Sequence, residues 1–155
     1  MDGIDCVDGV RKDILVKLEH KYHKKKWCHL FMYNKFKNQN AFLNGIVLLI
    51  MAFAMVVSVW ENSFAVIGLT ALSGFVKVWS DFKKFPNMTN MSKFAYTTYA
   101  KFQTELKTYT DGVELDDFET LLVKLQAMED TVIDIAPPLS EECQRQCEHH
   151  TFYYA

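Results

Sequence analysis

The chain has 155 residues, which is the size of one domain and excludes a large multidomain enzyme. Half of the residues are apolar and the formal net charge is only −2, so the overall charge gives no sign of a nucleic-acid partner. These averages hide an uneven distribution, because the 38 residues from Phe42 to Trp79 carry only two charges, Glu61 and Lys77. The sequence therefore predicts a membrane-type segment between water-exposed segments.

The charges differ in sign between the two ends of the chain. Residues 11–37 contain nine basic residues against two acidic ones, whereas residues 111–155 contain eleven acidic residues against two basic ones. This asymmetry indicates two different surroundings, such as an anionic membrane for the first segment and a basic protein for the second. The alternative is that the two segments neutralise each other within one fold.

Residues 1–40 are predicted to form a basic, aromatic helix, because apolar residues recur there at spacings of three and four. Lysines and aromatic residues then alternate directly before the apolar segment. The residues expected at the membrane interface here are Lys24, Lys25, Lys26 and Trp27. Next to a membrane span, this pattern favours anionic lipid headgroups over RNA as the partner.

Residues 41–79 are predicted to form a transmembrane hairpin of two helices, 41–60 and 64–79. Twenty helical residues extend about 30 Å, the hydrocarbon thickness of a bilayer, whereas the shorter second helix needs Lys77 to snorkel. Since only three residues connect the helices, they must run antiparallel and leave both termini on one side. The lysines outside the hairpin place that side in the cytosol, with Trp60 and Trp79 at the interfaces.

Small residues inside the two spans are expected to let helices approach closely. These packing candidates are Ala54, Ser58, Gly68, Thr70 and Gly74. The pattern does not distinguish packing within the hairpin from packing between copies of the chain. Neither span contains an interior carboxylate, arginine or histidine, which argues against a proton relay or a coupled transporter.

Residues 80–137 are predicted to form a cytosolic helical pair. Pro86 interrupts the chain, and the first helix is expected to restart near Ser92 and to end at Asp111–Gly112. The second helix follows a capping box formed by Asp116 and Glu119, and it carries an apolar seam at a/d spacing. The seam consists of Phe118, Leu121, Leu125, Met128, Val132 and Ile135.

The partner of this seam is not fixed by its pattern. Three heptads are marginal as an isolated coiled coil, so we expect the seam to fold back on the preceding helix. Pairing with another chain is the alternative. The acidic exterior of the helix would repel anionic lipid and offers a surface to a basic protein.

Residues 138–155 form a tail that contains the one cluster with ligand chemistry, Cys143, Cys147 and His149. Two thiolates and an imidazole could bind zinc, but this spacing is not a familiar zinc module. The sequence therefore favours reduced thiols and no bound metal. Phosphate-binding loops, nucleophile elbows and zinc-protease motifs do not occur, so we expect no enzyme, no cofactor and no small-molecule substrate.

The order of the segments resembles that of the SLATT group of two-span membrane proteins. The resemblance covers about residues 24–137, from the Lys24–Phe36 segment through the hairpin to the Phe118–Ile135 helix. It implies a basic helix before two closely spaced spans and a cytosolic helical pair after them. It also implies an oligomeric membrane pore or sensor in a defence system, without catalytic residues.

The expected fold class is all-α: a two-span transmembrane hairpin between an N-terminal basic amphipathic helix and a C-terminal cytosolic helical pair. We expect a non-enzymatic integral membrane protein, a structural anchor that also binds other subunits, either copies of itself or a basic lattice protein. A minor virion protein that links an internal virion membrane to its capsid shell is one example. The alternatives are a SLATT-like oligomeric pore and a metal sensor built on Cys143 and Cys147.

Overall fold

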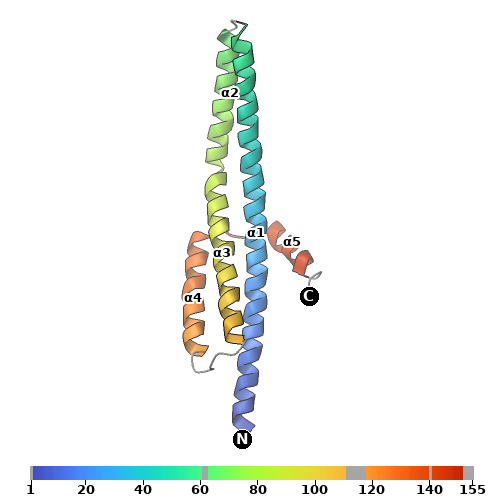
Figure 1. Ribbon diagram of the computed structural model, residues 1–155, viewed down its shortest axis with the longest axis vertical. Helices are drawn as coiled ribbons and strands as arrows, with labels where there is room; N and C mark the ends of the chain where they lie inside the picture. Colours follow the sequence, from blue (N-terminus) through green and yellow to red (C-terminus); the bar gives the residue numbers. More distant parts are fainter. Residues whose placement is uncertain (1, 61–62, 111–117, 140, 152–155) are drawn as a thin grey trace. The chain divides into compact units, whose positions relative to one another are not determined.

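The computed structural model describes residues 2–60, 63–110, 118–139 and 141–151. They form the helices α1 (Asp2–Ser58), α2 (Ser63–Phe82), α3 (Phe85–Thr110), α4 (Phe118–Ile135) and α5 (Glu141–Thr151), drawn in Figure 1. The described ranges contain no strand, which confirms the all-α class for them. The predicted Asp116 cap lies outside these ranges.

The chain divides into two compact units, each described here by itself. The bundle unit contains Met1–Met32 and Met91–Ala155, and the hairpin unit contains Tyr33–Asn90. Helix α1 passes from one unit into the other without a break. Residues 10–44 contain neither glycine nor proline, so nothing in the sequence stops the helix between the basic segment and the apolar one.

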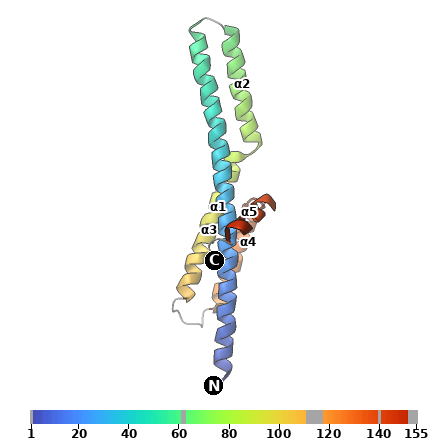
Figure 2. The same ribbon diagram turned by 90° about the vertical axis from the view of Figure 1, so that its right-hand side faces the viewer.

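In the hairpin unit, the second half of α1 and helix α2 run antiparallel (Figures 1 and 2). Helix α2 ends at Phe82, and Lys84 adopts a left-handed backbone conformation with φ of 53°. Helix α3 then begins at Phe85, so the expected restart near Ser92 is wrong. Pro86 lies in the first turn of α3, where its missing N–H has no helical partner to lose, and it therefore starts the helix.

In the bundle unit, the first half of α1 packs with α3 and α4 around one apolar core. An aromatic cluster lies at its centre: the ring of Phe102 is 5.0 Å from that of Tyr22 and 5.4 Å from that of Tyr99. The buried members of the core are Leu15, Tyr22, Ala95, Tyr99, Phe102, Leu106, Phe118, Leu121, Leu125 and Val132. Three helices of one chain thus complete a core without a second copy.

The α4 seam faces this core along most of its length. Four of its residues are core members, and Met128 is partly buried against them. Ile135, at the last position of α4, remains 40% exposed. Within a single chain, the seam therefore folds back as expected.

Candidate functional site

The hairpin unit exposes most of its large apolar side chains. Exposure reaches 90% at Phe64. The other exposed apolar side chains of the unit are Phe42, Leu48, Leu49, Met51, Phe53, Met55, Val56, Val59, Trp60, Ile67, Leu72, Phe75, Val78, Trp79 and Phe82. Two helical stretches, within Gly9–Ser58 and Ser63–Tyr109, are long and apolar enough to cross a membrane. An apolar surface of this kind is rare on a protein that functions in water.

The interior of the hairpin is built from small side chains. Its buried residues, among those that the structure describes, are Ala54, Val57, Ser73 and Ser80. Small side chains at a helix contact let the two backbones approach closely, as in membrane proteins. Of the five predicted packing residues, the structure therefore places only Ala54 inside the hairpin.

The other four predicted packing residues, Ser58, Gly68, Thr70 and Gly74, are exposed. A Cβ atom added at Gly68 or Gly74 would meet nothing within 4 Å, so both positions have room for a side chain. Two hydroxyls bond to their own helix: Thr70 Oγ1 donates to the Val66 carbonyl at 2.8 Å, and Ser58 Oγ donates to the Met55 carbonyl at 2.6 Å. Such bonds satisfy hydroxyl groups where no water is available.

The predicted interface residues lie in both units. Near the end of α2, Lys77 forms an ion pair with Asp81 at 3.7 Å, and the Lys83 Nζ lies 5.2 Å from the Trp79 ring centre. Trp60 is exposed at the end of the first apolar stretch. In the bundle unit, Lys26 Nζ donates to Gln103 Oε1 at 2.7 Å and Trp27 Nε1 donates to His23 Nε2 at 3.1 Å. Lys24 is partly exposed.

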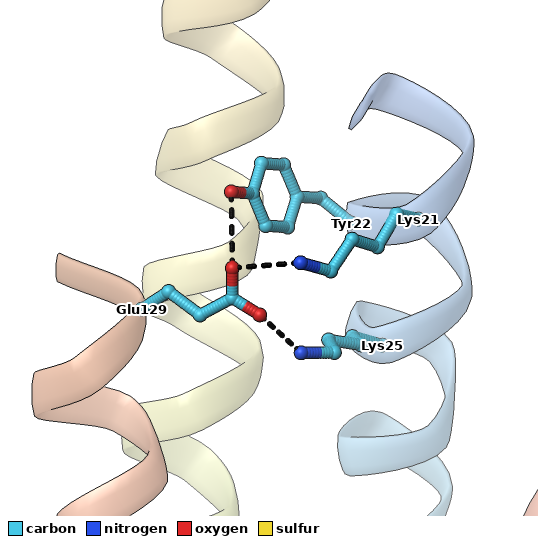
Figure 3. Close-up of polar contacts among 4 residues, drawn as sticks. All are labelled: Lys21, Tyr22, Lys25 and Glu129. Carbon is cyan, nitrogen blue, oxygen red and sulfur yellow. Dashed lines mark hydrogen bonds and ion pairs between the residues drawn. The ribbon is translucent and has the colours of Figure 1, made fainter. Parts of the chain in front are cut away.

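A polar cluster around Glu129 joins the basic helix α1 to the acidic helix α4 (Figure 3). Glu129 accepts hydrogen bonds from Lys21 at 2.9 Å, from Tyr22 at 3.3 Å and from Lys25. Its side chain is only 13% exposed. Burial raises the pKa of Glu129, but the hydrogen bonds and charges of Lys25 and Lys21 outweigh that effect and lower the pKa below its usual value.

This cluster bears on the charge asymmetry of the sequence. Both its lysines belong to the basic segment of residues 11–37, and Glu129 belongs to the acidic segment of residues 111–155. The ion pair between Lys124 of α4 and Glu105 of α3, at 3.2 Å, does not involve the basic segment. Part of the opposite charge is therefore neutralised within the bundle, which was the alternative to two separate partners.

Replacing Glu129 by Gln is expected to lower the free energy of unfolding by about 1–3 kcal/mol. The substitution removes the negative charge while Lys25 stays largely desolvated. The contribution of Lys21 is smaller, since its side chain is 46% exposed and water screens it. Thermal unfolding of the full chain in detergent, followed by circular dichroism, measures the loss.

The matched control is Asp130→Asn, because Asp130 is the next residue of α4 and is exposed. It removes the same charge without touching the cluster, so we expect a change within about 0.5 kcal/mol. Equal destabilisation by both variants would contradict a specific role of Glu129.

Among the histidines whose side chains the structure describes, only His29 is buried. It is 4% exposed, it stacks on Tyr99 at 5.6 Å between ring centres, and its Nδ1 has no partner among the described residues. Burial, assisted by the charge of Lys25, lowers the pKa of His29 to about 4. A largely apolar pocket of about 250 Å³ lies beside it. Ligand pockets are usually larger, about 300–1,000 Å³, and we assign no ligand to this one.

The buried environment of His29 predicts that the free energy of unfolding decreases in mild acid. The unfolded chain binds the proton below pH 6.5, whereas the folded chain resists it until about pH 4. The free energy of unfolding should therefore drop as the pH falls from 6.5 to 4, by up to about 3 kcal/mol from this residue.

Melting temperatures measured across that pH range test this effect. His29→Leu removes the proton site from the apolar core, so its pH dependence should be shallower than that of the unchanged chain. His20→Leu is the control, because His20 is exposed on the same helix. Parallel pH profiles for His29→Leu and the unchanged chain would contradict the assignment.

The structure brings a third cysteine to the predicted pair Cys143 and Cys147. Cys28 of α1 lies beside them, and the three Sγ atoms are all within 4.8 Å of one another. Cys143 Sγ also donates to the Cys28 carbonyl at 3.4 Å. The side chain of His149 lies outside the described residues. Cys28 could not be predicted as a member of this cluster, because no spacing rule connects two residues 115 positions apart.

No family model, curated protein or solved structure matches the chain.

Proposed function

We propose that the protein is an integral membrane anchor. The hairpin unit crosses a bilayer, and the bundle unit provides a folded surface in the aqueous phase. The observation that carries this proposal is the apolar exterior of the hairpin, whose buried residues are too small to account for its apolar content. Exposing a Val, Leu or Phe to water costs about 1.5–3 kcal/mol, so lipid would relieve a cost on the order of tens of kcal/mol.

The dimensions of the hairpin agree with this role. Helix α2 has 20 residues, which extend about 30 Å and match the hydrocarbon core of a bilayer. An antiparallel pair returns the chain to the side on which it entered. The lysines that flank the hairpin, Lys35 and Lys37 before it and Lys83 and Lys84 after it, favour the cytosolic side and anionic headgroups.

The bundle supplies the surface for other subunits. Acidic side chains are exposed along α4 at Glu119, Asp130 and Asp134. A surface of this charge repels anionic lipid and suits a basic protein partner. We therefore propose that the chain anchors a protein assembly to its membrane, as a minor virion protein does between an internal membrane and its shell.

Alkaline carbonate extraction of membranes tests the anchor. The unchanged chain is expected to remain in the membrane pellet. Leu49→Arg places a charge within the first apolar stretch, at a cost of about 2.5–3.5 kcal/mol, and should shift a large fraction of the chain to the supernatant.

Val123→Arg is the matched control for Leu49→Arg. Val123 lies on α4 and is 69% exposed, close to the 72% of Leu49. The two variants therefore place the same charge at similarly exposed positions, one in the bundle unit and one in the hairpin unit. Release of the unchanged chain, or equal release of both variants, would contradict insertion of the hairpin.

A pore is the second candidate function, favoured by one face of α2. Thr70 and Gly74 are one turn apart and exposed, and Gly74 has open space around it, so this face could pack against another copy. Dye-loaded vesicles that contain the protein distinguish the two functions. The anchor predicts no leakage. Leakage that Gly74→Leu abolishes and Gly68→Leu retains would overturn the anchor in favour of an oligomeric pore.

A further inference from the structure

The three cysteines of the bundle come from two helices that are distant in sequence. Cys143 and Cys147 are four residues apart and therefore lie on one face of α5, whereas Cys28 belongs to α1. Figure 2 shows α5 against the first half of α1. Cys28 is 1% exposed, Cys143 is 2% exposed and Cys147 is 4% exposed. All three are reduced thiols.

Few of the described side chains of helix α5 are buried. It is 11 residues long, and among its described side chains only Cys143 and Cys147 are buried. An isolated helix of this length is marginal in water, so its position depends on the contact that these two thiols make. Two small side chains bury little apolar area between α5 and α1.

The chemistry of three converging thiols favours a metal ion. Zinc binds thiolate sulfur at about 2.3 Å, which places two sulfur ligands about 3.8 Å apart in a tetrahedral site. The present Sγ separations, all within 4.8 Å, are close to that spacing.

A redox role suits these thiols less well. Thiol–disulfide exchange requires a thiolate that solvent can reach. Here all three thiols are buried, and none of the three residues is more than 4% exposed. A disulfide would also use only two of the three sulfur atoms and leave the third beside it.

We propose that Cys28, Cys143 and Cys147 bind one Zn²⁺ ion through three thiolates and thereby fasten α5 to α1. Binding releases the three thiol protons, and a further ligand completes the tetrahedron. The site is independent of the membrane proposal, because every residue in it belongs to the bundle unit. Its role is structural: the metal supplies the stabilisation that the sparse packing of α5 lacks.

The test uses the full chain, purified in detergent with a non-thiol reductant and titrated with Zn²⁺ or Co²⁺ alone. We expect about one metal ion per chain by elemental analysis. Co²⁺ should give the sulfur-to-metal charge-transfer absorption and the intense visible bands of a tetrahedral thiolate site. This spectrum is recorded on the unchanged chain, so it does not depend on whether a variant folds.

The variants Cys28→Ser and Cys147→Ser should each lose most of the bound zinc and weaken the cobalt spectrum. Cys6→Ser is the matched control and should bind as the unchanged chain does. Cys6 is on the same helix as Cys28 but 22 residues earlier, or about 33 Å along the axis, too far to reach the site.

Several results would overturn the proposal. One is a chain that binds no Zn²⁺ at excess metal, and another is an octahedral cobalt spectrum without sulfur charge transfer. Retention of Cu⁺ in place of Zn²⁺ would overturn the choice of metal. A disulfide between two of the three cysteines in protein isolated without reductant would overturn the metal site in favour of a redox link.

Discussion

The hairpin unit has an apolar exterior that its own interior cannot cover. The proposed membrane role of the protein follows from this constraint. Two helices in contact can bury only the strip along which they meet. Here that strip consists mainly of small residues such as Ala54 and Ser73, so most of the large apolar side chains face outward. Water is a poor solvent for such a surface, whereas lipid is a good one. The hydroxyls of Ser58 and Thr70, which bond back to their own helix, suit the same surroundings.

The bundle unit shows how the remaining polar part of the chain satisfies its charges. Glu129 forms ion pairs with two lysines of the strongly basic first segment, and Lys124 forms an ion pair with Glu105. Of the lysines predicted to face lipid headgroups, Lys25 and Lys26 bond instead to Glu129 and Gln103. The lysines that flank the hairpin, such as Lys37 and Lys83, are exposed and better placed for headgroups. An overall charge asymmetry in a sequence can therefore reflect an internal contact as much as an external partner.

Local sequence patterns predicted the elements better than they predicted the contacts. The seam of α4 was found because its apolar spacing repeats and Pro137–Pro138 ends it. In α1 apolar spacing alone does not identify the buried face: Val10 is 56% exposed, whereas Leu15 enters the core. The start of α3 was misplaced because Pro86 can begin a helix as readily as it can end one.

The candidate sites depended on long-range contacts that no local pattern contains. Cys28 meets Cys143 only because α5 returns to α1, and sequence spacing carries no information about that return. The face of α2 that contacts α1 could likewise not be predicted from the sequence. Thr70 and Gly74 have the spacing of a packing motif, but the structure buries Ser73, which precedes Gly74, and Ser80, seven residues after Ser73.

Whether the hairpin crosses a bilayer is tested most directly by the accessibility of one position before and one position after the apolar stretch of α2 in sealed microsomes, whose outer face is the cytosolic one. Ser63→Cys and Asn90→Cys, each in a Cys6→Ser background, place one exposed thiol at the hairpin turn and one beyond the hairpin. A membrane-impermeant maleimide should label the cysteine at position 90 in intact vesicles and that at position 63 only after detergent. Equal labelling of both positions in intact vesicles would contradict a hairpin that crosses the bilayer.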